Sequence, residues 1–167
     1  MVVKKIPGIG ADLSLLHIAR DLLTTETEVQ VIRVCLDFID QLAQPYDGGP
    51  STEVTAGLKG LKKDLFDLCF NTNPSIASKA FRFVKAHISM LEFKQEEIRQ
   101  LCHLVFYEEE GVAAVAADFI DMMYFNGDLL HETASSEEFA FLVSIKIFSI
   151  KILTKFNRRI KKKVENN

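Results

Sequence analysis

Cysteine is scarce in this chain of 167 residues, and its three cysteines are far apart. Cys35, Cys69 and Cys102 form no Cys-x-x-Cys pair, and their number is odd. A disulfide framework or a zinc site needs paired or clustered cysteines, so neither is expected. Each cysteine lies inside an apolar helical pattern, which predicts buried free thiols in a reducing compartment.

Long apolar runs are also lacking. No stretch reaches the roughly 18 uninterrupted apolar residues of a membrane-spanning helix, and the nearest, 139–153, is interrupted by Lys146 and Lys151. The N-terminus lacks the apolar core of a secretion signal. With 48% hydrophobic and 26% charged residues, the composition is that of a folded soluble protein. We expect an intracellular protein of about one domain.

Recognisable catalytic and metal-binding motifs are missing as well. The acidic run Glu108–Glu110 lacks the ligand offsets of a calcium loop and is expected to be solvated, at the unfavourable C-terminal end of a helix dipole. Gly48–Gly49 lacks the Lys-Ser/Thr ending of a P-loop. None of the four histidines occurs in an HExxH motif or beside a second histidine at helical spacing: His17, His87, His103 and His131. We therefore expect no enzymatic activity, cofactor, metal or small-molecule substrate.

Apolar residues recur at spacings of three and four along most of the chain, which predicts amphipathic helices and no strands. Thr25 with Glu28 predicts a capping box, and Asn73 before Pro74 predicts a helix start. About seven helices are expected, over residues 12–23, 25–44, 53–70, 75–91, 96–107, 112–125 and 137–155.

Two helices carry small or apolar residues on more than one face. The helix 25–44 has two apolar stripes, and Ala113, Ala114, Ala116 and Ala117 would let neighbouring backbones approach closely. Helices packed on both flanks are typical of solenoids, and the segments 53–91 and 94–125 have the size of HEAT repeats. The sequence therefore predicts an all-α, HEAT-like α-solenoid, with a bundle of four to seven helices as the alternative.

The expected organisation is an irregular lead-in at 1–10, a helical-repeat domain at 11–157 with a unit boundary at 45–52, and a basic tail at 158–167. Net charge is −3, but basic residues gather near the C-terminus. The tail is interpreted as a solvated, frayed terminus or as a nucleic-acid or nuclear-import segment. Candidate contacts to nucleic acid or an acidic partner are Lys59, Lys62, Lys63, Arg158, Arg159, Lys161, Lys162 and Lys163.

Part of the chain resembles the HEAT-repeat region of the stromal antigen (stromalin) family, a subunit of the cohesin complex. His103–Phe106 matches the family's His-Leu-Val-Tyr run, and Val112–Ile120 matches its Val-Ala-Val-Ala-Ala-Gly-Glu-Phe-Leu segment. Ser75–Phe81 resembles the start of the preceding helix. The match covers roughly 62–125, with Gly111 where the family has proline. The chain also has no tryptophan, which the family's neighbouring domain is expected to carry.

This resemblance implies a helical scaffold that binds a kleisin subunit and other cohesin subunits, contacts DNA, and supports sister-chromatid cohesion and chromosome segregation in the nucleus. It supplies no binding residues, because the family's partner-binding residues lie largely outside the matched stretch. The alternative function is a general α-helical adaptor for protein partners without a chromatin role.

Overall fold

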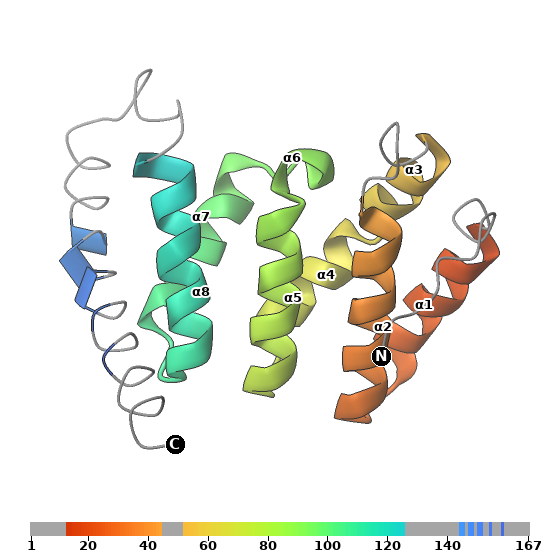
Figure 1. Cartoon of the computed structure of the whole chain (residues 1–167), viewed down its shortest axis with the longest axis horizontal. Helices are drawn as coiled ribbons and strands as arrows, with labels where there is room; N and C mark the ends of the chain where they lie inside the picture. The colour runs from red at the N-terminus through yellow and green to blue at the C-terminus, as the bar shows by residue number, and fades with distance from the viewer. Residues whose placement is uncertain are drawn as a thin grey trace. The chain divides into compact units, whose positions relative to one another are not determined.

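The computed structural model describes residues 13–44, 52–125, 144, 145, 147, 148, 150, 151, 154 and 158. Every regular element among them is helical, so the all-α class is confirmed. In chain order these are α1 (Leu13–Thr25), α2 (Val29–Ala43), α3 (Thr52–Gly60), α4 (Lys62–Cys69), α5 (Pro74–Ala86), α6 (Ile88–Leu91), α7 (Gln95–His103), the 3-10 turn η2 (Leu104–Phe106), α8 (Glu110–Ile120) and the π-helical turn η3 (Asp121–Phe125) (Figure 1).

The chain divides into two compact units, Met1–Phe93 and Lys94–Asn167. This division falls where the predicted helical hairpin 94–125 begins. Residues 45–51, which hold most of the predicted boundary between repeat units, lie outside the described residues, as do the lead-in 1–10 and the connection 126–136.

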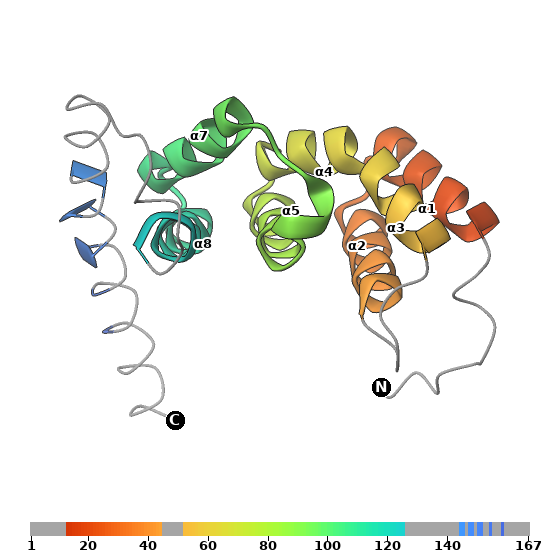
Figure 2. The same ribbon diagram turned by 90° about the horizontal axis from the view of Figure 1, so that it is seen from above.

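The first unit has two layers of helices. α2 packs against α1 and α5, while α4 packs against α5 and α1. Seen from above, α2 and α5 lie side by side in one layer, with α1 and α4 in the other (Figure 2). The core between the layers is apolar and fully buried at Leu36, Ile39, Leu58, Leu65 and Phe81. Burial of such side chains is the main stabilising contribution, about 1.5–3 kcal/mol for each.

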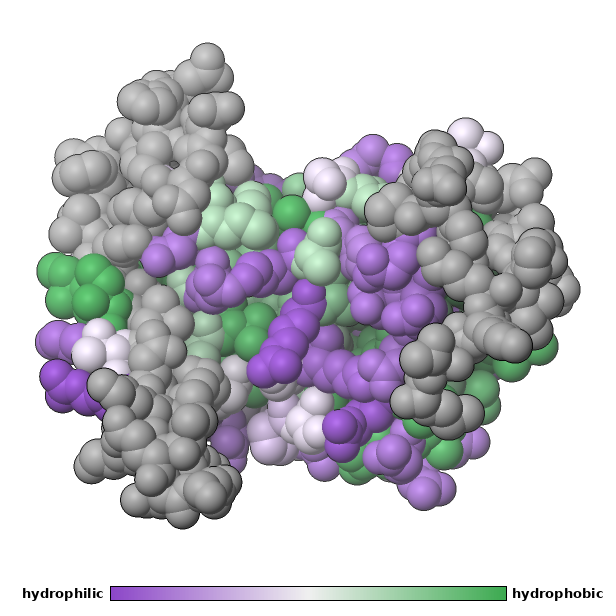
Figure 3. All heavy atoms as spheres, viewed as in Figure 1, coloured by the Kyte–Doolittle hydropathy of each residue, from purple (hydrophilic) through white to green (hydrophobic). Residues whose placement is uncertain are grey.

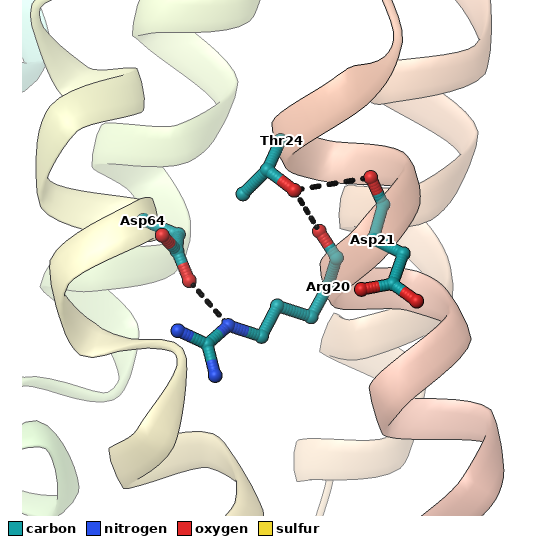
Figure 4. Close-up of polar contacts among 4 residues, drawn as sticks. All are labelled: Arg20, Asp21, Thr24 and Asp64. Atoms are coloured by element: carbon teal, nitrogen blue, oxygen red, sulfur yellow. Dashed lines mark hydrogen bonds and ion pairs between the residues drawn. The ribbon is translucent and has the colours of Figure 1, made fainter.

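One ion pair joins α1 to α4 at the edge of this core. The Arg20 Nε donates to Asp64 Oδ2 at 3.0 Å (Figure 4). Beside it, the Thr24 hydroxyl donates to the backbone oxygens of Arg20 and Asp21, at 3.0 and 3.1 Å. Because the Arg20 side chain is half exposed, the pair stabilises the contact by no more than about 1 kcal/mol.

The second unit contains the hairpin of α7 and α8. In α8 every residue from Val112 to Ala117 is buried, the four alanines included. The prediction that this helix is packed on more than one side is therefore confirmed. Its partners within the unit include α7, η2 and η3.

The predicted helix 53–70 is wrong as a single element, because it breaks at Leu61 into α3 and α4. The Leu61 N–H donates to the Leu58 oxygen at 3.0 Å, three residues back, which is a 3-10 turn rather than an α-turn. Gly57 and Gly60 precede the break, and glycine disfavours helix by about 1 kcal/mol per residue. Burial of both Leu58 and Leu61 then fixes the turn.

The predicted helix 75–91 also breaks, at His87, into α5 and α6. His87 leaves the helical conformation with φ −116° and ψ 22°. Its ring lies against the Phe83 ring, with centroids 4.6 Å apart, and contacts Asp40 of α2. The Asp40 contact joins residues 47 positions apart and has no local sequence signal, so helical periodicity alone could not locate the break.

The predicted capping box of Thr25 and Glu28 is wrong. α1 extends through Thr25, whose hydroxyl donates to the Asp21 oxygen at 2.6 Å, and Glu28 caps α2 without a side-chain hydrogen bond. The start at Asn73 and Pro74 is confirmed. The Asn73 Oδ1 accepts from the N–H groups of Ser75 and Ile76, at 3.0 and 3.4 Å.

The substitution Asn73→Ala is expected to destabilise the protein by about 1 kcal/mol, because it removes the side-chain acceptor of the Ser75 N–H and one of the two acceptors of the Ile76 N–H. Urea unfolding followed by circular dichroism measures this loss. Thr72→Ala is the matched control at the neighbouring exposed residue, with a change within about 0.5 kcal/mol. Equal stability of the two variants would contradict a capping role for Asn73.

Two further predictions for the second unit are wrong. Glu109 and Glu110 cap and open α8, so the acidic run lies at the favourable N-terminal end of a helix dipole. In the predicted helix 137–155, spacings of three and four place Ile147 in the main apolar stripe and leave Ile145 outside it. The Ile147 side chain is instead 53% exposed, whereas Ile145 is fully buried. Phe148, about one turn after Ile145, packs on Phe106 with ring centroids 5.0 Å apart. This contact turns the side of the segment that carries Ile145 and Phe148 toward the rest of the unit.

Candidate binding groove between α2 and α5

A groove of about 610 Å³ runs between the neighbouring helices α2 and α5 of the first unit. The face over these two helices is mainly hydrophilic (Figure 3). Its walls combine five charged residues with serine and glutamine, while Leu36 and Phe83 are nearly buried beneath them. The lining residues are Arg33, Leu36, Asp37, Asp40 and Gln44 from α2 and its C-cap, and Ser75, Ser78, Lys79, Arg82, Phe83 and Ala86 from α5.

The α2 wall is a regular polar stripe. Arg33, Asp37, Asp40 and Gln44 follow one another at spacings of four, three and four, so they share one side of the helix. The apolar residues that the helix buries, such as Leu36 and Ile39, lie on its other sides. The pattern of α2 therefore supplies both a core face and a polar groove wall.

One ion pair and one histidine–carboxylate contact join α2 to α5 and its C-cap. Lys79 Nζ lies 2.5 Å from Asp37 Oδ1, and His87 Nε2 lies 3.1 Å from Asp40 Oδ1. Asp40 follows Asp37 along α2, and its partner His87 likewise follows Lys79 along the chain. The two helices therefore run parallel. Both carboxylates of the groove are thus engaged by cationic or donor groups of α5.

The two arginines of the groove differ from these residues in their hydrogen bonding. Arg33 and Arg82 are exposed, and neither forms a hydrogen bond or an ion pair with any residue that the structure describes. The pKa of Lys85, on the same helix, is lowered mainly by burial and to a smaller extent by the nearby Arg82 charge. The groove therefore presents two guanidinium groups whose hydrogen-bonding capacity is unused within the described part of the chain.

The His87–Asp40 contact resembles part of a catalytic triad, but the serines of the groove are distant from it. Ser78 precedes His87 by more than two turns of α5, roughly 13 Å along the helix axis. A nucleophile must come within about 3 Å of its base. The groove thus offers binding chemistry from cationic, amide and hydroxyl groups, without a serine nucleophile beside His87.

Lys59 and Lys62, two of the predicted nucleic-acid contacts, bind Glu92 after α6. Lys59 Nζ lies 2.6 Å from the Glu92 carboxylate, and Lys62 Nζ donates to the Glu92 backbone oxygen at 3.1 Å. Lys62 Nζ also lies 4.8 Å from the centroid of the Phe93 ring. Glu92 has φ 52°, a left-handed conformation that costs a non-glycine residue roughly 1–2 kcal/mol. The two lysines therefore stabilise this turn.

Of the other predicted contacts, Lys63 and Arg158 are exposed, and Lys63 has no ion pair with a described residue. Arg158 is helical, so the first residue of the predicted basic tail has regular structure. The remaining four lie outside the described residues: Arg159, Lys161, Lys162 and Lys163. None of the four predicted cations that the structure describes lines the α2/α5 groove.

The three cysteines are free and buried, as predicted. Burial is the main cause that raises the pKa of each thiol, and it raises the pKa of Cys102 to about 12 despite a hydrogen bond with Tyr124. The Cys69 thiol donates to the Leu65 oxygen at 3.3 Å. Thiols with raised pKa are poor nucleophiles and metal ligands. Within the described residues, no cluster of three or more histidine, cysteine or acidic side chains could hold a metal ion.

Sequence reasoning did not single out the groove residues. The usable signal was the polar stripe from Arg33 to Gln44, which lies beside the two apolar stripes of the same helix. Its counterpart on α5 could not be paired with it from sequence, because the contact between α2 and α5 joins residues more than forty positions apart.

Comparison with protein-family models, with curated proteins and with solved structures found no match to this chain. In the part of the chain that the structure describes, no helix is both long and apolar enough to cross a membrane.

Proposed function

We propose that this protein is a non-enzymatic helical-repeat scaffold that holds a segment of a partner protein in the α2/α5 groove. The observation that carries this proposal is the groove itself, a polar channel between two parallel helices of one layer. Helical-repeat proteins characteristically bind extended partners along such surfaces. The pairs α1–α2, α4–α5 and α7–α8 are in contact within their units, as the helices of a HEAT-like repeat would be.

The stromal-antigen resemblance specifies this proposal further. Its matched residues fall on α4, α5, α7, η2 and α8, and the alanines that carry much of it are buried in α8. On that basis the partner is a kleisin-type or other cohesin subunit, and the scaffold acts in the nucleus, on chromosomes. DNA contact would come from exposed cations such as Lys63 and Arg158. Neither a membrane nor a small-molecule substrate is part of the proposal.

The test is affinity capture from nuclear extract with the full chain and with a variant whose groove is filled. Ser78 lines the groove and is half-buried, so Ser78→Trp should obstruct the groove without changing its charge. Ser89→Trp, at an exposed residue of α6, is the matched control. We expect cohesin core subunits to be recovered by the wild type and the control, and their recovery to fall at least about fivefold with the groove variant, the loss of roughly 1 kcal/mol of binding.

If the wild type instead recovers proteins other than cohesin subunits, and Ser78→Trp loses them, the protein is a general adaptor and the cohesin assignment is wrong. Equal recovery by both tryptophan variants would refute groove binding altogether. Circular dichroism of each variant establishes that its helices are intact before the comparison is made.

A further inference from the structure

The cations of the α2/α5 groove divide into two kinds. Lys79 is used within the protein, because it binds Asp37 of the opposite wall. Arg33 and Arg82 remain without a hydrogen bond or ion pair among the described residues, and both side chains are exposed at the groove. The planar guanidinium group can donate two parallel hydrogen bonds to a carboxylate. These two arginines therefore leave donors available for the carboxylates of a ligand.

We propose that the groove binds an extended, acidic segment of a partner protein, with Arg33 and Arg82 each holding one of its carboxylates. This inference rests on the proposed scaffold function and names the chemistry of the partner. From Arg33 to Gln44 the α2 wall runs for roughly 16 Å, which about five residues of extended peptide would cover. Gln44, Ser75 and Ser78 supply donors and acceptors for the peptide backbone.

The same lining argues for a protein segment and against a nucleic-acid strand. Asp37 and Asp40 lie between the two ends of the α2 wall, and a continuous phosphate backbone would run past both carboxylates. A peptide can place neutral residues there and acidic residues only beside the arginines. Leu36 and Phe83, at the base of the groove, suit an apolar side chain between two acidic ones.

The experiment measures binding of labelled peptides to the full chain by fluorescence anisotropy. The probes are the nonapeptide (Glu-Leu-Glu)3, its neutral counterpart (Gln-Leu-Gln)3 and an oligothymidylate of nine nucleotides. We expect the acidic peptide to bind more than about tenfold tighter than the neutral one, because hydrogen bonds to charged groups are the stronger ones. This difference should shrink at high salt, since exposed charges are screened.

Charge reversal at the groove is compared with the same reversal elsewhere. Arg33→Glu with Arg82→Glu should weaken acidic-peptide binding by at least about tenfold, whereas Lys94→Glu with Lys151→Glu, at exposed cations outside the groove, should leave it within about twofold. Arg33→Lys with Arg82→Lys keeps the charge but loses the paired hydrogen bonds, so its affinity should fall between those of wild type and the reversed variant.

Equal loss in the two reversed variants would overturn the inference, because the effect would then reflect net charge alone. Preferential binding of oligothymidylate through Arg33 and Arg82 would also overturn it and assign the groove to nucleic acid. If the arginine variants still recover the nuclear partner while Ser78→Trp does not, the scaffold function stands and the acidic chemistry is wrong. If Ser78→Trp also recovers the partner, the scaffold function itself fails.

Discussion

Truncation of Phe81 to alanine is expected to lower the free energy of unfolding by about 3–5 kcal/mol. Phe81 is fully buried in α5 of the first unit. The substitution removes the transfer free energy of the ring and leaves a cavity that the surrounding helices cannot fill. Because a domain of this size has roughly 5–15 kcal/mol of stability in total, the first unit would be close to unfolding.

The measurement is urea unfolding followed by circular dichroism. Phe70→Ala is the matched control, since the Phe70 side chain is 41% exposed and its described ring contact is with Phe66, at 5.1 Å. Loss of that contact is expected to cost about 1 kcal/mol. A similar cost for both substitutions would contradict the placement of Phe81 at the centre of the core.

Enlargement of Ala116 to phenylalanine is expected to destabilise the protein by about 3 kcal/mol, at the upper end of the usual cost of overpacking. Ala116 is fully buried in α8, among consecutive buried residues. Close packing leaves no space for a ring, so neighbouring helices would have to move apart. The substitution tests whether the alanines are required because other backbones lie close to α8.

Thermal unfolding compares this variant with Ala56→Phe, at an exposed residue of α3. The control should cost less than about 1 kcal/mol, because it changes only helix propensity. If Ala116→Phe were as stable as the control, the alanine run would have to be explained by helix propensity rather than by packing.

Several features of the fold could be predicted because they depend on neighbours in the sequence. Asn73 and Pro74 mark a helix start whatever surrounds them, since the cap satisfies N–H groups two and three residues away. The burial of α8 was similarly visible in its composition. By contrast, the break at His87 and the inward face at Ile145 depend on contacts with distant residues.

The candidate site shows the same division. Sequence reasoning favoured lysines because clustered charge is visible locally, but Lys59 and Lys62 are engaged by Glu92 in the folded chain. Arg33 and Arg82 are unremarkable in sequence. They stand out only once Asp37, the carboxylate one turn after Arg33, is bound by Lys79 of another helix.

The sequence by itself therefore determined that this protein is all-helical, where most of its helices lie, and that its cysteines are buried, because periodicity and composition act over a few residues. Only the tertiary structure decided which ion pairs form, where the predicted helix 75–91 breaks and which side of α2 faces a groove. The break at His87 and the groove depend on α5 lying against α2, a contact between segments too far apart in the chain for local propensity to specify.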